Sequence, residues 1–457
     1  MEGAVVNPCK ACAPLGAALA MKGISSSMSI LHGSQGCATY IRRFFIGHFR
    51  EPVDIASSSF DENTAVFGGR ENLIRGISNI VKKYAPEVIG IATSCLAETI
   101  GEDIGMYMKE LAEVEGVTFI HTDTAAYQGT HINGFMKMTA AAAALAEKHE
   151  AGDSADSVSG RLRLNIIPWM VSPADIRALK RLMSDMNIDA VFLPDYSLTL
   201  DGTNWSDYEA IPHGGTTLDA IRTMGRAHHT IQFGPVSSEA ANPAEVIKQK
   251  TGVPYSVLQL PLGLKNTDAF FTRIIELGSN YGCEVKLPEE QRETRGRLLD
   301  AYADVHKYLA GLSAAVYGEV DFMSAIAGFL CELGINPAVC MTGEQLNAGQ
   351  IKNIQGSIAH YGFSSPQILA DSDFADLDSV LGAEIKADLL VGNSRGFKSS
   401  RQAGLPLVRV GFPVQDRFGG QRILHLGYDG ALSLTDRIAN KIISEKQAAS
   451  PVGYMSM

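Results

Sequence analysis

The sequence predicts an α/β protein made of three doubly wound domains with mainly parallel sheets. The first observation is its length, because 457 residues exceed a single ordinary core when one domain takes roughly 150 residues. The second is that short apolar runs alternate along the chain with stretches of helical pattern. Strands that alternate with helices indicate parallel sheets with right-handed crossover connections. The third is a polar segment, EKHEAGDSADSVSG at 147–160, which predicts a linker between domains.

The first domain is expected to span residues 1–155. The stretch EVIGIATSCLAETIGEDI predicts a strand over Val88–Thr93, then a turn and the start of a helix. An alanine-rich helix is predicted over 134–148. In a parallel sheet the loops at the carboxyl ends of the strands line the crevice that binds ligands. Cys95 lies on one of those loops.

The second domain is expected over 160–295, and it begins with a βαβ unit. RLRLNIIPWMV predicts a strand, and DAVFLPD predicts the strand that follows the helix. Between them a helix is predicted, with Ser172 as its N-cap and Pro173 at its first position.

A third domain over 300–415 repeats the alternation. Its strands are predicted in SAAVYG, NPAVCM, ADLLVGNS and PLVRVGF, and its first helix is expected to end at Gly334. The remaining residues, 416–457, are expected to form a helical tail that packs back on the other domains.

Composition and charge narrow the class of protein. The formal net charge is −11, which argues against nucleic acid as a partner because such proteins normally carry a basic stripe. No apolar run reaches the ~20 residues that span a membrane, and the start lacks a basic-then-apolar secretion signal. We therefore expect a cytoplasmic protein with reduced thiols. Seven cysteines, an odd number, exclude complete internal pairing.

Two of the seven cysteines, Cys9 and Cys12, form a C-x-x-C pair that Pro8 and Pro14 bracket in a loop. Such a pair is compatible with a redox couple, with half of a zinc site, or with coincidence. A zinc ribbon would need a second C-x-x-C, which the sequence lacks. The pair alone therefore leaves all three interpretations weak.

Three cysteines lie on three separate loops next to glycine or proline. Cys37 follows GSQG, Cys95 follows a predicted strand, and Cys12 belongs to the C-x-x-C pair. Thiolate ligands with close backbone approach favour an iron–sulfur cluster over zinc. The alternative is that each cysteine simply packs in the core. We expect packing for Cys331 and Cys340, and Cys283 has no evident partner.

Longer motifs carry a family resemblance. NPCKACAPLGAALAMKGI, LHGSQGCATYIRRFFIGHFREPV, AVFGG, TSCLAETIGED and VRVGFPVQDRFGGQRILHLGYDGA together resemble nitrogenase component 1 proteins of the β type. That group contains the β subunit of the catalytic protein, its cofactor-assembly counterpart and nitrogenase-like reductases. The resemblance covers nearly the whole chain, and it implies the nitrogenase component 1 type of fold.

The resemblance also implies a site and partners. Cys12, Cys37 and Cys95 match three cysteine ligands of the P-cluster, an 8Fe-7S cluster that the β subunit shares with an α-type subunit in an α2β2 heterotetramer. Cys9 is outside that set. An ATP-dependent iron protein would supply the electrons, with Phe67 of AVFGG near its docking surface or, alternatively, packed as an ordinary aromatic. The chain has no G-x-x-x-x-G-K-[ST] motif, so a partner must handle ATP.

Two departures from the catalytic β subunit shape the functional expectation. Ala126 of TAAYQGTH stands where that subunit has a serine able to ligate the oxidised cluster, and the C-terminal stretch looks closer to the assembly subunit. This combination favours an electron-transfer subunit of a nitrogenase-like reductase, for example one that acts on small organic sulfur compounds such as methylthio-alkanes. The alternative is a scaffold for cofactor maturation with a 4Fe-4S cluster. A metal-chelate binding protein is a poorer third choice, because no secretion signal is present.

Other polar residues near these motifs are expected to have structural roles. His32 of LHGSQGC is expected to be an ordinary turn histidine, with a hydrogen bond near the cluster as the alternative. Glu98, Glu102 and Asp103 of AETIGED are expected at a helix N-terminus, where the helix dipole favours negative charge. No substrate-reducing pocket is evident, and the resemblance assigns that pocket to the α-type subunit.

Overall fold

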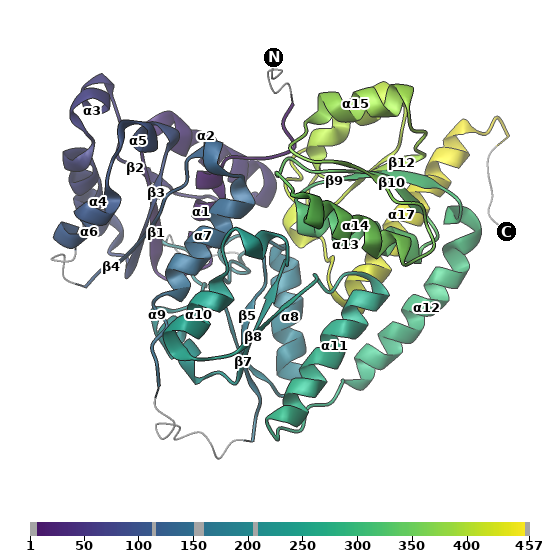
Figure 1. The fold of residues 1–457 in the computed structure, drawn as a ribbon, viewed down its shortest axis with the longest axis horizontal. Helices are drawn as coiled ribbons and strands as arrows, with labels where there is room; N and C mark the ends of the chain where they lie inside the picture. Colours follow the sequence, from purple (N-terminus) through teal and green to yellow (C-terminus); the bar gives the residue numbers. More distant parts are fainter. Residues whose placement is uncertain (1–6, 112–115, 150–159, 204–208, 453–457) are drawn as a thin grey trace. The chain divides into compact units, whose positions relative to one another are not determined.

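Three parallel sheets flanked by helices form the protein, as the sequence predicts, and Figure 1 shows them in a computed structural model. The structure describes residues 7–111, 116–149, 160–203 and 209–452. The described part of 11–258, together with 277–285, forms one compact unit that contains the first two sheets. The described residues of 1–10, 259–276 and 286–457 form a second unit around the third sheet. Most of the predicted linker, 150–159, lies outside the described residues.

The first sheet has the strand order β2-β1-β3-β4, with every pair parallel. Helices cover both of its faces (Figure 1), and the hydrophobic cluster between β1, β3, α4 and α6 fills one side. The elements are α1 Ala13–Met21, β1 Ser27–His32, α2 Gln35–Phe49, β2 Ala56–Ser57, α3 Glu62–Phe67, α4 Arg70–Tyr84, β3 Val88–Thr93, α5 Cys95–Ile100, α6 Ile104–Leu111, β4 Thr118–Thr122, η1 Ala126–Gln128 and α7 His131–Ala143.

Strand β3 has the bounds that the sequence predicts, whereas β1 was not expected. Serines at alternate positions interrupt its apolar pattern, yet all six residues of β1 are buried. The hydroxyl of Ser27 donates to the carbonyl of Met21 at 2.6 Å, which satisfies one of these buried polar groups. The alanine-rich helix α7 starts before the predicted residue 134, because Thr130 and Asn133 form a capping box at its N-terminus.

The second sheet has the order β6-β5-β7-β8, again fully parallel. As predicted, Ser172 caps the first helix and Pro173 is its first residue; the Ser172 hydroxyl accepts from the backbone N–H of Asp175 at 3.0 Å. The elements are β5 Arg163–Ile167, α8 Pro173–Asp185, β6 Asp189–Phe192, α9 Leu218–Arg222, η2 Thr223–Arg226, β7 His229–Phe233, η3 Ser237–Glu239, α10 Pro243–Thr251 and β8 Tyr255–Leu258.

The third sheet has the order β11-β10-β9-β12-β13, and all its strands are parallel. The C-terminal helix α17 packs along α12 within the same unit. The elements are α11 Gly263–Asn280, α12 Glu289–Leu309, β9 Ser313–Tyr317, α13 Val320–Glu332, β10 Asn336–Met341, α14 Ala348–Ala359, β11 Gln367–Leu369, α15 Phe374–Ala383, β12 Leu389–Gly392, η4 Ser394–Gly396, α16 Phe397–Ala403, β13 Leu407–Arg409, η5 Gly420–Arg422 and α17 Gly427–Ala449. The predicted boundaries 1–155, 160–295, 300–415 and 416–457 stay a prediction.

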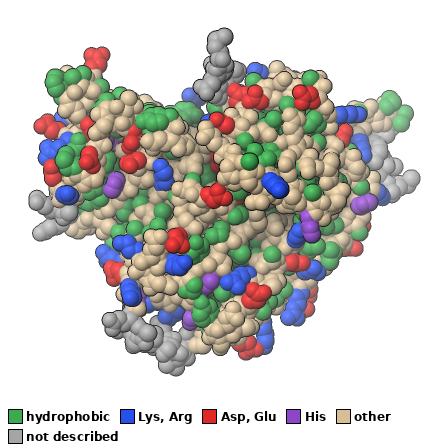
Figure 2. All heavy atoms as spheres, viewed as in Figure 1, with side chains coloured by type: hydrophobic (Ala, Val, Ile, Leu, Met, Phe, Trp, Pro, Cys, Tyr) green, Lys and Arg blue, Asp and Glu red, His purple; other side chains and the backbone are tan. Residues whose placement is uncertain are grey.

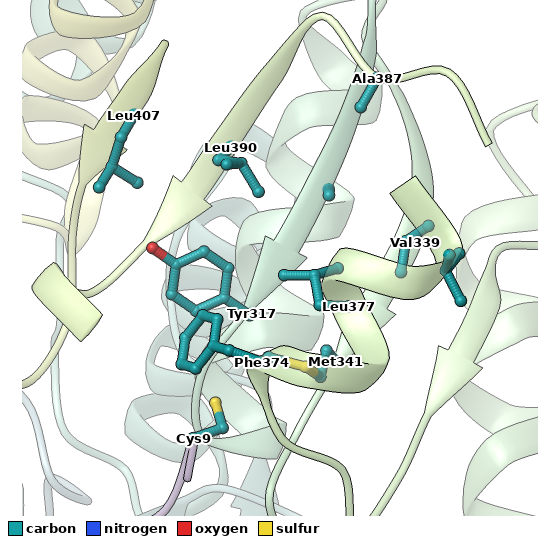
Figure 3. Close-up of a cluster of buried hydrophobic side chains, with 11 residues drawn as sticks. Cys9, Tyr317, Val339, Met341, Phe374, Leu377, Ala387, Leu390 and Leu407 are labelled. Atoms are coloured by element: carbon teal, nitrogen blue, oxygen red, sulfur yellow. The ribbon is translucent and has the colours of Figure 1, made fainter. Parts of the chain in front are cut away.

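The segment Asn7–Lys10 lies against the residues that follow the carboxyl ends of β9, β10 and β12. The guanidinium of Arg395 donates to the carbonyls of Pro8 at 2.6 Å and Lys10 at 3.1 Å. Cys9 is buried in a hydrophobic cluster that includes Tyr317 of β9, Met341 of β10 and Phe374 of α15 (Figure 3). Burial raises the pKa of the Cys9 thiol well above its usual range, so this cysteine is a packed, protonated side chain.

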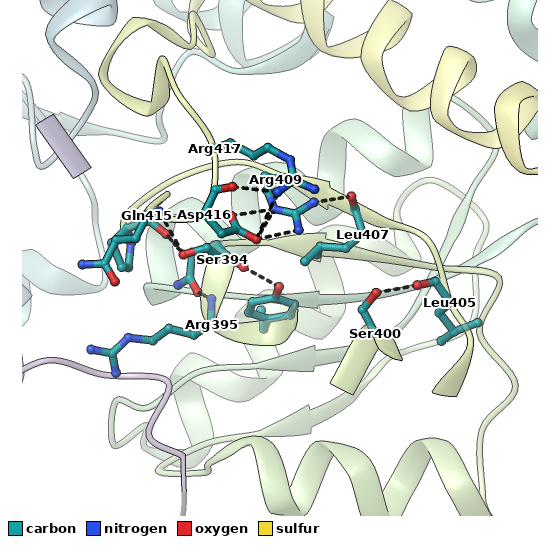
Figure 4. A network of polar contacts seen from close by, with 12 residues as sticks. Ser394, Arg395, Ser400, Leu405, Leu407, Arg409, Gln415, Asp416 and Arg417 are labelled. Carbon is teal, nitrogen blue, oxygen red and sulfur yellow. Dashed lines mark hydrogen bonds and ion pairs between the residues drawn. The ribbon is translucent and has the colours of Figure 1, made fainter. Parts of the chain in front are cut away.

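A polar network fixes the loop on which Arg395 lies (Figure 4). The hydroxyl of Ser394 donates to the carbonyl of Pro413 at 2.9 Å and accepts from the backbone N–H of Gln415 at 3.1 Å. Nearby, Arg409 forms an ion pair with Asp416 at 2.6 Å. The loops after β12 and β13 are therefore tied together, which holds Arg395 in place for the N-terminal segment.

The surface carries side chains of every kind, as the mixed composition of the sequence leads one to expect. Acidic, basic and apolar side chains are interspersed over the face drawn in Figure 2. Among the described residues, no helix combines the length and the hydrophobicity that crossing a bilayer requires.

Candidate functional site

The three cysteines singled out by the sequence all lie at the starts of helices in one unit. Cys12 is the N-cap residue of α1, Cys37 lies in the first turn of α2, and Cys95 is the first residue of α5. Strands β1 and β3 are parallel neighbours whose last residues, His32 and Thr93, pair with each other. The loops that carry Cys37 and Cys95 therefore leave the sheet side by side.

Cys12 reaches this place by a different route, through contacts with the start of α7. It forms an isolated antiparallel bridge with Thr130. The backbone N–H of Ala11 donates to Nδ1 of His131 at 3.2 Å, and the N–H of His131 donates to the carbonyl of Ala11 at 2.9 Å. The start of α1 is therefore bound to a segment about 120 residues farther along the chain.

Two glycines allow α1 and α7 to pack with their backbones in contact. A Cβ atom at Gly16 would lie 1.6 Å from the carbonyl oxygen of His131. A Cβ atom at Gly134 would lie 1.9 Å from the carbonyl oxygen of Ala13, the residue after Cys12. Any larger residue at either position would push the start of α1, and with it Cys12, away from α7.

The three thiols are close enough to influence each other electrostatically. Burial raises the pKa of Cys12, and negative charge on Cys37 and Cys95 would raise it further. The pKa of Cys37 is raised by burial and by the charge of Cys95. Bringing three thiolates together is therefore unfavourable without a cation, whereas a metal removes the thiol proton outright.

The residues present fit an iron–sulfur cluster better than a single metal ion. Among the described residues, no three His, Cys, Asp or Glu side chains converge on one ion position. Thiolates that serve a polynuclear cluster each bind a different iron, so they face a shared volume without converging on one point. The backbone N–H of Ala126 donates to Sγ of Cys95 at 3.2 Å, which is the amide contact to sulfur that tunes such clusters.

Large apolar side chains close to Cys37 and Cys95 are exposed to solvent. Both cysteines are exposed in the chain by itself. Beside them Tyr40, Leu96 and Tyr127 expose 51%, 38% and 63% of their surface. We call these five residues the cysteine face. Exposed large apolar side chains close to exposed thiols are typical of a surface that another protein covers.

Helix α3 presents a second exposed apolar feature. Val66 and Phe67 expose 74% and 85% of their surface, so the ring of Phe67 does not pack in the core of this chain. The packed-aromatic alternative for Phe67 therefore has no support in the geometry.

A buried polar network that the sequence did not predict lies beneath α3. Nε2 of His32 is 2.9 Å from Oε2 of Glu102, and both side chains are almost completely buried. Oε1 of Glu102 accepts from the backbone N–H of Gly69 at 2.8 Å, and Tyr107 also bonds this carboxylate. The ring of His32 packs edge-on against Phe60, with centroids 4.8 Å apart. His32 is thus a buried core residue and not a turn histidine.

Protonation in this network follows from its contacts. Burial lowers the pKa of His32 more than Glu102 raises it. Burial would raise the pKa of Glu102, but hydrogen bonds from His32, Gly69 and Tyr107 outweigh it and lower the pKa. A neutral His32 therefore donates to an ionised Glu102. Of the acids expected at helix starts, Glu98 lies in the first turn of α5, and Asp103 accepts from the N–H of Met106 in α6 at 2.9 Å.

Comparisons with known proteins agree with this geometry. The sequence profile of the family described as "Nitrogenase component 1 type Oxidoreductase" matches residues 12–443. The nitrogenase molybdenum-iron protein beta chain of Clostridium pasteurianum is 34% identical over 444 residues, which cover 96% of this chain and 93% of that protein. The corresponding chain of Methanothermobacter marburgensis is 36% identical over 456 residues, covering 96% and 95%. The solved structure "Nitrogenase Cp1 at pH 6.5" superposes with a TM-score of 0.91 at 32% identity, covering 100% of this chain and 97% of that one.

Proposed function

We propose that Cys12, Cys37 and Cys95 bind a P-cluster-type iron–sulfur cluster. The premise is that this chain belongs to the nitrogenase component 1 type oxidoreductases as a β-type subunit. The observation that carries the proposal is that the three cysteines lie at the starts of three helices of one unit, and that the loops of Cys37 and Cys95 leave two neighbouring strands side by side. Three thiols are too few to complete an 8Fe-7S cluster, so an α-type subunit supplies the remaining ligands. The exposed apolar cysteine face is the surface we assign to that subunit in an α2β2 heterotetramer.

Such a cluster, when bound, supplies one-electron transfer. The chain contributes ligands and their surroundings. The Ala126 amide places a partial positive charge against the Cys95 sulfur, which favours the more negative, reduced state. The methyl group of Ala126 cannot act as a ligand, so the redox-dependent exchange that the family serine permits should be reduced here.

The electron donor in this proposal is an ATP-dependent iron protein. Val66 and Phe67 project from α3 into solvent, and aromatic side chains are enriched among the residues that dominate binding energy. The chain has no phosphate-binding loop motif of its own, in keeping with ATP hydrolysis on the partner. The free thiols suit a reducing compartment, so we assign the complex to the cytoplasm.

The substrate is reduced on the α-type subunit in this proposal, with small organic sulfur compounds such as methylthio-alkanes as the class we favour. Ala126, in place of the family serine, is the observation that sets this chain apart from a standard catalytic subunit. The second candidate, a scaffold for cofactor maturation, rests on the C-terminal stretch, which looks closer to the assembly subunit. A scaffold would carry a 4Fe-4S cluster, so iron counting separates the two.

The test is to purify the chain with its α-type partner and to measure iron by metal analysis together with Mössbauer and EPR spectra. An eight-iron cluster lost in both Cys12→Ala and Cys95→Ala is the expected result. Cys9→Ala is the matched control, because Cys9 is packed in the other unit and its variant should keep the iron. Full iron in Cys95→Ala would overturn the site, and four irons per β-type chain would favour the scaffold.

The donor surface has its own test. Phe67→Ala should raise the apparent KM for the iron protein by about 10- to 30-fold, the usual effect of an interface hot spot, and leave the iron content unchanged. Phe418→Ala is the control, because Phe418 is equally exposed at 85% but lies in the other unit. An unchanged KM in Phe67→Ala would remove α3 from the docking surface.

A further inference from the structure

Helix α3 has few contacts of its own to hold it against the domain. It contains six residues, and only Thr64 among them is buried. A capping box between Asp61 and Thr64 closes its N-terminus. At its other end the chain turns through Gly68 and Gly69 into α4. The position of the exposed Phe67 therefore depends on what holds those two glycines.

The carboxylate of Glu102 holds that end of α3. Its Oε1 accepts from the backbone N–H of Gly69 at 2.8 Å. There is no room for a larger residue, since a Cβ at Gly69 would lie 2.2 Å from the ring of Phe60 and 3.0 Å from the ring of His32. The backbone, the carboxylate and the two rings therefore form one tightly packed junction. We call His32, Phe60, Gly69, Glu102 and Tyr107 the Glu102 junction.

Three residues of the Glu102 junction adjoin three different helices: α3, α2 and α5. Gly69 follows α3. His32 ends β1, and three residues later the chain enters α2, which carries Cys37. Glu102 follows α5, which carries Cys95, and its own N–H donates to the carbonyl of Ala97 in that helix at 3.1 Å.

The two cysteine loops are also joined directly beside the junction. The backbone N–H of Ser94 donates to the carbonyl of His32 at 3.0 Å. A Cβ at Gly33 would lie 2.0 Å from the hydroxyl of Ser94, so these loops touch without a gap. A displacement of either loop therefore reaches the other through backbone contacts.

We propose that Glu102 is a positioning residue that holds the exposed end of α3 in register with the helices of Cys37 and Cys95. This inference rests on the proposed role of α3 as the donor surface. Through the buried carboxylate, the place where the iron protein docks and the place where the cluster is bound share one rigid support. In this role Glu102 acts through Gly69 and His32, the groups that its two carboxylate oxygens contact.

The test compares Glu102→Ala with Glu102→Gln in the purified complex. Alanine removes the acceptor for Gly69 and His32, whereas glutamine keeps one oxygen to accept from Gly69. Hydrogen exchange of the peptide covering 62–69 should become about 10-fold faster in the alanine variant and change less than about 3-fold in the glutamine variant. The apparent KM for the iron protein should rise in the same order, with the iron content unchanged.

A matched control is Glu110→Ala, which removes a carboxylate from α6 whose ion pair with Arg70 is exposed. It should leave the exchange of 62–69 and the KM within about 2-fold of the parent, because exposed ion pairs contribute little. If Glu102→Ala does not accumulate in folded form, Tyr107→Phe replaces it, because this variant removes a single bond to the carboxylate.

The possible outcomes separate this inference from the proposed function. Unchanged exchange in 62–69 overturns the inference, and so does iron loss without faster exchange there, which indicates support of the cluster alone. If Phe67→Ala raises the KM while Glu102→Ala does not, the donor surface stands and the inference fails. If the parent complex holds no iron, the proposed function fails, and the exchange measurement still decides whether Glu102 holds α3.

Discussion

Replacing Gly134 by alanine tests whether the close crossing of α1 and α7 places Cys12. The new methyl group would start 1.9 Å from the carbonyl oxygen of Ala13, whereas an ordinary carbon–oxygen contact is about 3.3 Å. The backbones must therefore separate by about 1.4 Å at this point. The colliding atoms are the new Cβ and a backbone carbonyl oxygen, and neither moves when a side chain changes its rotamer. No rotamer change therefore relieves the overlap.

The free energy of unfolding should fall by a net ~2 kcal/mol. Overpacking of this kind costs up to ~3 kcal/mol, and the better helix propensity of alanine returns ~1 kcal/mol. At the proposed cluster site, the effect on iron content should be larger than the effect on stability. Site geometry tolerates only ~0.5 Å of displacement, and Ala13 directly follows Cys12, so the variant should lose most of its iron.

Gly296→Ala provides a control of opposite sign. Gly296 lies inside α12, and a Cβ there meets no atom within 4 Å, so alanine should stabilise by ~1 kcal/mol. Differential scanning calorimetry and iron analysis on both purified variants measure the contrast. Gly134→Ala with full iron and a melting temperature as high as that of Gly296→Ala would refute the reasoning.

Three further predictions follow from buried or capped groups. Arg395→Ala should release the segment Asn7–Lys10 and expose Cys9. Alkylation of Cys9 under native conditions, followed by mass spectrometry, should then become at least about 10-fold faster. Unchanged labelling would show that other contacts hold the segment. Burial raises the pKa of Glu344 from 4.5 to about 8, so between these pH values the folded state keeps a proton that the unfolded state releases. The free energy of unfolding therefore falls as the pH rises from 4.5 to about 8, and it levels off above that range. Glu344→Gln should flatten that fall in melting temperature measured from pH 5 to 9, and an unaltered pH profile would contradict it. Ser172→Ala should lower stability by ~1 kcal/mol through loss of the α8 cap, measured by calorimetry, and no change would mean that the capping bond contributes nothing.

Local sequence patterns predicted those elements whose cause lies within a few residues. Strand β3 and the start of α8 were placed correctly because a short apolar run, a serine cap and a proline suffice to define them. Strand β1 was missed because its serines disguise a strand that is buried on both faces. Nothing near Glu102 in the sequence indicates its bond to Gly69, which is 33 positions away.

The sequence by itself determined the parallel α/β architecture and the identity of Cys12, Cys37 and Cys95 as the thiols to consider, because periodicity and motif are written in neighbouring residues. Tertiary structure alone decided that Cys9 packs in a different unit from Cys12, that the Ala126 amide faces the Cys95 sulfur, and that Glu102 supports the end of α3. These contacts join segments that are distant in the chain. Their geometry depends on how closely the helices and strands between them can pack, and no local pattern carries that information.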